Sequence, residues 1–387
     1  MKISFIDSIN DIPQQDWNRV AGVQYPFTRH EFLSALENYD CLGEKWGWFP
    51  RHLTAYREGQ LVAAIPLYLK TNSYGELVFD GSWADAYQRT GLPYYPKLVS
   101  AIPYTPATGS RLLLDPTQVF STADQQQLIH AVTDYVRQHE LSSMHWLFPD
   151  QAQTELLKTA GLLIRTGCQF HWENQGYRDF TDYLSTLSAK KRKNIKRERR
   201  HVQEAGITIR QLQGHEASEQ EWAIFHQLYA STFDRKSGWA TLSLAFFLSI
   251  ARSMGQHILL ILCYEQDRAV AASLCFKSDT VLYGRHWGCN QAFHSLHFEA
   301  CYYQGLNYCI DHQLQRFDPG AQCEHKISRG FLPAPTYSAH WLAHPGFERI
   351  IQDYLVQETQ AMDDYMLDMM QHSPFKGQQS TCQQKPK

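Results

Sequence analysis

The chain has 387 residues, of which 43% are hydrophobic and 19% charged, and its formal net charge is -3. This composition supplies enough apolar material for one or two packed cores and excludes global disorder, while the length suggests about two domains. The small negative net charge excludes a protein that binds polyanions with its whole surface, so a phosphate or nucleic-acid contact must come from a local patch.

Membrane insertion, secretion and metal binding are not indicated by the sequence. No stretch approaches the roughly 18 consecutive apolar residues of a membrane-spanning helix, and the N-terminus reaches Asp7 without the apolar core of a signal peptide. The 9 cysteines form no Cys-x-x-Cys pair, which is typical of reduced thiols in a cytoplasm. His294-x-x-His297 stands without the further ligands of a zinc site. We therefore expect a cytoplasmic protein with no metal and no tightly bound cofactor.

Two similar hairpin patterns occur in the two halves of the chain. Residues 56–70 run from a tyrosine through a turn at Glu58-Gly59 into Val-Ala-Ala, and residues 264–277 run from a tyrosine through a turn at Asp267 into Val-Ala-Ala. Polar turn residues between two apolar runs predict a hairpin. A helical spacing of apolar residues precedes each pattern, at 27–36 and at 220–233. Domain duplication explains the repeat, and the alternative is a chance likeness of two amphipathic hairpins.

The duplication predicts the domain organisation. We expect an N-terminal domain at 1–165, a C-terminal domain with a basic helix at 166–345, a terminal helix at 346–372 and a disordered tail at 373–387. A helix at 123–139 and a strand at 144–148 would complete the first half, and a helix at 298–315 would belong to the second. Alternating strands and helices predict an α/β protein with a mixed sheet. Nucleotide-hydrolysis and dinucleotide-binding motifs are absent from the sequence.

The Pro- and aromatic-rich stretch 94–111 reads as an ordered loop of the first half. We predict that Tyr104 and Arg111 contact substrate there, with Arg111 gripping an anion. A purely structural loop is the alternative.

Eight of the eleven residues 190–200 are basic. A narrow helical seam runs beside this segment and is formed by Leu184, by Leu187 or Lys191, and by Ile195 and Val202; Ser188 is placed to cap the helix. Like charges at this density repel one another, which favours a polyanionic partner such as tRNA, a nucleotide diphosphate or a coenzyme phosphate. The alternative is a solvated helix face.

The expected strand 283–289 carries Tyr283 and, between Gly284 and Gly288, the side chains of Arg285, His286 and Trp287. Glycines in a strand suggest a close backbone approach, here to a ligand. Strict alternation would place Tyr283, Arg285 and Trp287 on one face and His286 on the other, so that these two groups would not easily serve one site. Alternatively, Tyr283 and Trp287 belong to the core and Arg285 to the surface.

The segment 317–331 is punctuated by glycine and dense in polar side chains. Acyl transfer to an amine needs a general base and a donor to the tetrahedral oxyanion. Glu324 or His325 could supply the base, and Lys326 or a backbone N–H the donor; the alternative is a polar loop with a local ion pair. Glu299, at the start of the preceding helix, either carries charge into a site or complements the helix dipole.

These motifs resemble those of the FemAB-like predicted N-acyltransferases, a tandem acetyltransferase-fold family that carries the label of peptidoglycan biosynthesis. The resemblance extends from residues 27–33 to residues 340–344. Its most specific segments are PYTPATG (103–109), KKRKNIKRER (190–199), GRHWG (284–288) and EHKI (324–327).

The resemblance implies two tandem acetyltransferase-like (GNAT-fold) domains and transfer of an acyl or aminoacyl group to an amine. In the Fem aminoacyltransferases the donor is aminoacyl-tRNA and the acceptor is a peptidoglycan precursor. The basic run looks like the corresponding segment of those enzymes, which implies ligand contacts by Lys191, Arg192 and Arg197.

Two departures from the family pattern bear on the donor. Cys323 stands where the pattern has Gly, which puts a close backbone approach at that position in doubt. The coenzyme A signature, Arg/Gln-x-x-Gly-x-Gly/Ala before a helix, is absent from both halves. That signature aims backbone N–H groups at phosphate, so its absence favours aminoacyl-tRNA or another activated donor over acyl-CoA, or a domain that only binds.

The sequence therefore predicts an N-acyltransferase whose cleft lies in the second half. Glu324, His325 and Lys326 are the candidates for chemistry, and Arg285 and the basic run for an anionic donor or acceptor. The alternative is a non-catalytic RNA- or precursor-binding protein on the same fold. A membrane-surface role is weaker because the seam lacks a large apolar face. DNA is not an expected partner, and the oligomeric state stays open.

Overall fold

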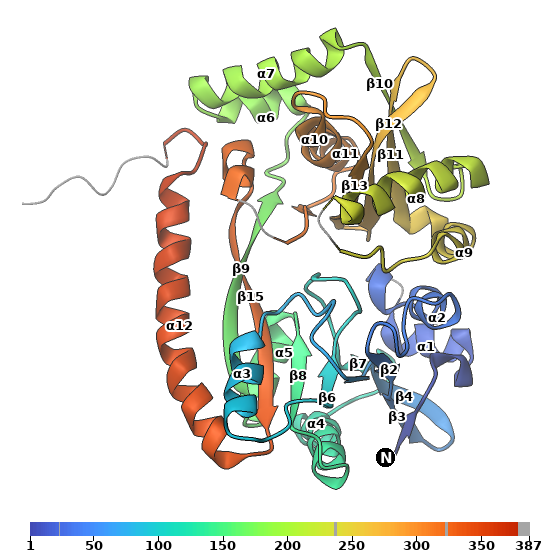
Figure 1. Ribbon diagram of the computed structural model, residues 1–387, viewed down its shortest axis with the longest axis vertical. Helices are drawn as coiled ribbons and strands as arrows, with labels where there is room; N and C mark the ends of the chain where they lie inside the picture. The colour runs from blue at the N-terminus through green and yellow to red at the C-terminus, as the bar shows by residue number, and fades with distance from the viewer. Residues whose placement is uncertain (23, 236–237, 322–323, 378–387) are drawn as a thin grey trace, which may run out of the picture. The chain divides into compact units, whose positions relative to one another are not determined.

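The computed structural model describes residues 1–22, 24–235, 238–321 and 324–377 (Figure 1). The chain divides into two compact units: unit 1 comprises Met1–Gly167, Thr241–Ile250 and Pro335–Met362, and unit 2 comprises Cys168–Ala240, Ala251–Ala334 and Asp363–Lys387. Four elements supply residues to both units: β9 (Leu163–Glu173), α9 (Leu244–Met254), β15 (Leu332–Leu342) and α12 (Pro345–Gln371). The domain limits expected from the sequence stay a prediction, and residues 378–387 of the expected disordered tail lie outside the described residues, as does Cys323.

Unit 1 contains two groups of paired strands, in the orders β1-β3-β4-β7 and β15-β8-β6-β5-β2. Its strands are β1 (Lys2–Ile6), β2 (Trp48–Pro50), β3 (His52–Arg57), β4 (Gln60–Ile65), β5 (Tyr68–Lys70), β6 (Lys97–Ser100), β7 (Leu113–Leu114) and β8 (Ser143–Leu147). Its helices are α1 (Gln14–Ala21), α2 (His30–Asn38), α3 (Gly81–Arg89), α4 (Thr122–Gln138) and α5 (Gln151–Thr159). The apolar face of α4 packs on the strands β3, β6 and β8.

Unit 2 is built on strands in the order β10-β11-β12-β13-β14-β9. These strands are β10 (Ile207–Gln213), β11 (Ile258–Glu265), β12 (Arg268–Lys277), β13 (Val281–Cys289) and β14 (Arg316–Asp318), with β9 at the end. The helices are α6 (Phe180–Thr186), α7 (Ala189–Glu204), α8 (Glu219–Asp234), α10 (Leu296–Phe298) and α11 (Gln304–Asp311). A π-helix, Glu299–Tyr303, joins α10 to α11, and a 3₁₀-helix spans Glu324–Arg329.

The repeated hairpins are confirmed, and they share more than their sequence suggested. The β3–β4 hairpin turns at Glu58-Gly59 and the β11–β12 hairpin at Gln266-Asp267. In each, the register shifts by one residue at the valine of Val-Ala-Ala, which is Val62 in the first and Val270 in the second. A bulge at the same place in both hairpins is expected of duplicated domains.

The long helices follow the sequence patterns, with two interruptions. α8 begins with a capping box between Ser218 and Glu221, and α4 begins with the same device, as their N-terminal residues favour. The seam beside the basic run belongs to two helices, because the chain leaves α6 at Leu187 and starts α7 after Ser188. The expected helix 298–315 is divided by the π-helix. Among the described residues, no helix has both the length and the apolar character needed to cross a membrane.

Candidate functional site

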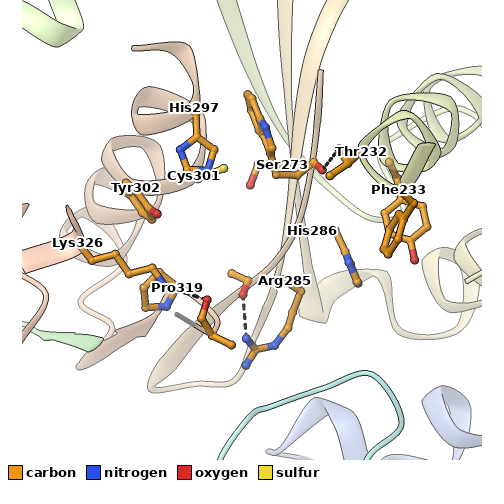
Figure 2. Close-up of a pocket in the computed structure, with 14 residues that line it drawn as sticks. Thr232, Phe233, Ser273, Arg285, His286, His297, Cys301, Tyr302, Pro319 and Lys326 are labelled. Atoms are coloured by element: carbon orange, nitrogen blue, oxygen red, sulfur yellow. Dashed lines mark hydrogen bonds between the residues drawn. The ribbon is translucent and has the colours of Figure 1, made fainter. Parts of the chain in front are cut away.

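A cavity opens in unit 2 where two parallel strands separate. β13 pairs with β14 only from Val281 to Tyr283, and beyond this point the strand ends diverge around a cavity of about 290 Å³. Figure 2 shows side chains entering it from β13, α8, the π-helix region and the 3₁₀-helix. The lining residues are Tyr229, Thr232, Phe233, Ser273, Gly284, Arg285, His286, Trp287, His297, Cys301, Tyr302, Pro319, Ala321 and Lys326.

A β-bulge in β13 brings adjacent side chains to this one cavity. Gly284 lies opposite Cys275 and His286 lies opposite Leu274, so Arg285 is the extra residue of the bulge. The bulge interrupts the alternation of side chains at Arg285, while His286 packs against Tyr229 of α8 and Trp287 against His297. Arg285, His286 and Trp287 nevertheless all line the cavity, so the expectation that they would not easily serve one site is not met.

The two glycines of this strand allow a close approach of other backbone segments of the protein, where the sequence suggested the approach of a ligand. A Cβ atom on Gly288 would lie 2.0 Å from the carbonyl oxygen of Leu228 in α8. One on Gly284 would lie 3.3 Å from the Cα of Pro319. Both glycines thus let neighbouring backbone pack against β13, and α8 in turn brings Thr232 to the cavity, where its hydroxyl donates to the Trp287 carbonyl at 2.8 Å.

Arg285 forms a buried ion pair at the cavity wall. Its Nη2 donates to Asp318 Oδ2 at 3.1 Å, and the two side chains are 3% and 2% exposed. Nη1 donates to the Gly284 carbonyl at 2.9 Å. Burial alone would raise the pKa of Asp318, but the Arg285 charge, His171 and the hydrogen bonds from the Gly320 N–H and Arg285 together outweigh burial, and the pKa is lowered. The pair joins the diverging ends of β13 and β14, and Asp318 offsets the Arg285 charge.

Lys326 and His286 are two further nitrogen-bearing side chains of the cavity wall. Lys326 is buried, and its Nζ donates to the Gly320 carbonyl at 2.6 Å. Burial, with the Arg285 charge adding to it, lowers the pKa of His286 to about 3, so this imidazole is neutral at any ordinary pH. No aspartate or glutamate occurs among the described residues that line the cavity. The cavity therefore favours a ligand that carries or develops negative charge.

The remaining wall comes from the π-helix region. His297, Cys301 and Tyr302 line the cavity there, and π-helical turns are frequent at functional sites. Burial raises the pKa of Cys301 well above its usual value, so it is a thiol. The Tyr302 hydroxyl lies 3.3 Å from His325 Nε2, and burial together with Arg329 lowers the pKa of His325.

Of the three residues predicted to perform chemistry, the structure brings one into the cavity. Lys326 lines it, His325 is one contact away through Tyr302, and the exposed Glu324 accepts a hydrogen bond from Tyr365 at 3.2 Å. Their catalytic roles stay predictions.

Of the residues predicted to contact substrate, the structure likewise brings only some to the cavity. Arg285, His286 and Trp287 line the cavity, whereas Tyr283 is buried in the core and Glu299 is buried in an ion pair with Arg199. On α7, the half-buried Lys191 donates to Ser328 Oγ at 2.9 Å, Arg192 is also half-buried, and Arg197 is exposed.

Tyr104 and Arg111 belong to unit 1. Tyr104 donates through its hydroxyl to the Cys41 carbonyl at 2.7 Å. The fully buried Arg111 donates to the carbonyls of Leu147, Ala107 and Gly109 at 2.8–3.0 Å. These contacts support the structural alternative for Arg111, because its guanidinium is engaged by backbone oxygens.

Sequence reasoning did not find several wall residues. Tyr229, Thr232 and Phe233 share one face of α8, and their spacing within a recognised helix was the only available signal. Ser273 and Cys301 carried no signal, because a strand serine and a helix cysteine are ordinary in a core.

The duplicated hairpins and the parallel strand pair define a tandem acetyltransferase-like α/β protein, which confirms the expected fold class. The chain belongs to the FemAB-like family, whose description is peptidoglycan biosynthesis/recognition and whose model matches residues 8–377. Membership supports the class of acyl or aminoacyl transferases on this fold.

The solved structures with a similar fold include the following two. The C-terminal domain of a proposed lysylphosphatidylglycerol synthetase from Agrobacterium fabrum has a TM-score of 0.53 at 8% identity, with 90% of this chain and 96% of that chain covered. FemX has a TM-score of 0.50 at 10% identity, with 91% of this chain and 100% of that chain covered. No curated protein matches the sequence.

Proposed function

We propose that the cavity of unit 2 transfers an acyl or aminoacyl group from an activated donor to an amine, with a cell-wall precursor as the class of acceptor. The observation that carries this proposal is the buried Lys326 side chain, whose Nζ donates to the Gly320 carbonyl, at a cavity whose described lining contains no carboxylate. Such a group stabilises an oxyanion more strongly than it would in water. Membership of a peptidoglycan biosynthesis/recognition family supports the choice of acceptor.

The reaction is a direct substitution at the donor carbonyl. The acceptor nitrogen attacks the carbonyl carbon, Lys326 Nζ stabilises the tetrahedral oxygen, and the C–O or C–S bond to the donor breaks as the C–N bond is completed. The amine proton passes through the Tyr302 hydroxyl to His325, whose lowered pKa leaves it neutral and able to accept. The leaving oxygen or sulfur takes up a proton from solvent and protonated His325 releases one to solvent, so that no net proton is gained or lost. Trp287 and the neutral His286 offer the acyl group an aromatic wall.

We assign the donor to aminoacyl-tRNA rather than acyl-CoA. The coenzyme A phosphate signature is absent from the sequence. Five cations of α7 are exposed, which suits a long polyanion. They are Lys190, Lys193, Lys196, Arg197 and Arg200.

The test is transfer of label from charged bulk tRNA and, separately, from acetyl-CoA into acid-stable product, with purified protein and a small-molecule cell extract. We expect transfer from tRNA that weakens steeply with salt. Transfer from acetyl-CoA alone would overturn the donor assignment. No transfer, with intact binding of tRNA or a nucleotide-linked precursor, would favour the non-catalytic binding protein.

The role of Lys326 is tested in the same assay. Lys326→Ala should lower turnover by about 10²–10³-fold, the effect of removing one oxyanion donor. Lys158→Ala, which removes an exposed lysine of α5 in unit 1, is the control and should leave turnover unchanged. Wild-type turnover in folded Lys326→Ala would refute the assignment.

A further inference from the structure

Helix α7 has two faces with different environments. The five exposed cations named above form the outer face. The inner face is buried or half-buried, and its members are Lys191, Ile195, Glu198, Arg199 and Val202. The inner face contacts the π-helix and the 3₁₀-helix, which are the two segments that carry Cys301, Tyr302 and Lys326 to the cavity.

Glu198 is the one acidic residue of the run 190–200, and it faces inward. Its two carboxylate oxygens each accept from Arg329 Nη2 at 2.9 Å, and the Tyr303 hydroxyl also donates to it. The side chains of Glu198 and Arg329 are 16% and 6% exposed. Removal of one partner from such a pair leaves the other charge buried without compensation.

Arg329 links Glu198 to the 3₁₀-helix that bears Lys326. Its Nη1 donates to the His325 carbonyl at 2.8 Å and its Nε to the Tyr303 hydroxyl at 3.0 Å. Its guanidinium lies 3.5 Å from the centre of the Phe298 ring. With every guanidinium nitrogen in contact, Arg329 fixes the backbone of the 3₁₀-helix at the residue that precedes Lys326.

The neighbouring Arg199 makes a second contact of the same kind. Its Nε and Nη2 donate to the two oxygens of Glu299 at 3.1 and 3.0 Å, and the Glu299 side chain is 4% exposed. Glu299 opens the π-helix that carries Cys301 and Tyr302. Two adjacent residues of α7 therefore hold both segments of this cavity wall.

We propose that Glu198 is a positioning residue for the transfer reaction, which acts through Arg329 to keep Lys326 at the Gly320 carbonyl and facing the cavity. The catalytic consequence rests on the proposed function, whereas the placement of Lys326 is measurable without any activity. Because the outer face of the same helix carries the exposed cations, docking of a polyanionic donor and the geometry of the cavity depend on one rigid element.

The first test compares Glu198→Gln with Glu204→Gln, which removes the same charge from an exposed position of α7. Brief labelling with acetic anhydride, followed by mass spectrometry, reports the accessibility of each lysine. We expect Lys326 to label about tenfold faster in Glu198→Gln, as loss of one charged hydrogen-bond pair allows. Lys70 and Lys97, both buried in unit 1, should stay protected. Protection of Lys326 in Glu198→Gln, the same gain in Glu204→Gln, or a parallel gain at Lys70 and Lys97 would overturn the proposal.

The second test is kinetic. We expect Glu198→Gln to lower kcat by about 10–100-fold, as a small misplacement of a catalytic group does, with KM for charged tRNA unchanged because the outer face is intact. Glu198→Gln combined with Arg329→Gln should lose no more activity than the more damaging single variant. Additive losses, or a raised KM at unchanged kcat, would overturn the positioning role. An inactive wild-type protein would instead refute the proposed function, and the labelling result would then decide the placement of Lys326.

Discussion

We expect a buried pair of histidines to make the protein labile to acid. His145 on β8 and His340 on β15 are register partners, and their Nδ1 atoms lie 2.6 Å apart. Each residue is 1% exposed. A hydrogen bond between these nitrogens needs one donor and one acceptor, so at least one of the two rings must be neutral. Burial lowers the pKa of both rings well below the ordinary value of 6.5, with nearby positive charges adding to it.

The sign of the effect follows from proton uptake. As the pH falls through 6.5, the two imidazoles of the unfolded chain bind protons, whereas the folded pair does not. The unfolded state then holds more protons, so the free energy of unfolding falls with pH. Between pH 7.5 and pH 5.5, one such histidine lowers the free energy of unfolding of the protein by about 1.4 kcal/mol, and the pair lowers it by about 3 kcal/mol.

The assay is denaturant unfolding at pH 7.5, 6.5 and 5.5. The variant His145→Gln/His340→Gln keeps hydrogen-bonding groups on both strands but removes both titrations. Its free energy of unfolding should fall by about 3 kcal/mol less than that of the wild type over this range. His130→Gln, at an exposed position of α4, should behave as the wild type does. Equal losses in all three proteins would refute the reasoning.

Two further substitutions test the packing around the cavity. Gly288→Ala would place a methyl group 2.0 Å from the Leu228 carbonyl oxygen, so we expect a destabilisation of about 1–3 kcal/mol by thermal unfolding; an unchanged Tm would contradict the close approach of α8. Asp318→Asn would leave the Arg285 guanidinium buried without its counter-charge, and urea unfolding should show a loss of about 3–5 kcal/mol. A loss below about 1 kcal/mol, typical of exposed pairs, would mean that water reaches this ion pair.

The local features of the fold were predictable because their causes are local. The hairpin turns follow from short polar segments between apolar runs, and both Glu58 and Gln266 adopt the positive φ, 51° and 55°, that such turns require. The long helices follow from apolar spacing and, at α8, from the Ser218–Glu221 capping box. The repeat of Val-Ala-Ala then indicated the duplication, because the same local pattern forms the same hairpin in both halves of the chain.

The arrangement of the site was less predictable, because its causes are contacts between distant segments. Alternation suggested that Arg285 and His286 would not easily serve one site, and the bulge at Arg285 is visible only in the pairing with β12. The basic run was read as one cationic surface. Its Glu198 and Arg199 face inward because Arg329 and Glu299, more than 95 residues away in sequence, complete their hydrogen bonds.

The duplication allows corresponding strand ends of the two units to be compared. The parallel pair β6–β8 of unit 1 occupies the same place in the strand order as β13–β14 of unit 2. In unit 1 the loop 109–111 contacts the end of β8: the Gly109 N–H donates to the Phe148 carbonyl at 3.1 Å, and Arg111 Nε donates to the Leu147 carbonyl at 3.0 Å. In unit 2 the corresponding ends diverge around the cavity that Lys326 enters. At the end of β8 unit 1 thus holds loop backbone and a buried arginine, whereas unit 2 holds the cavity that Lys326 lines, so a search for substrate should begin at unit 2.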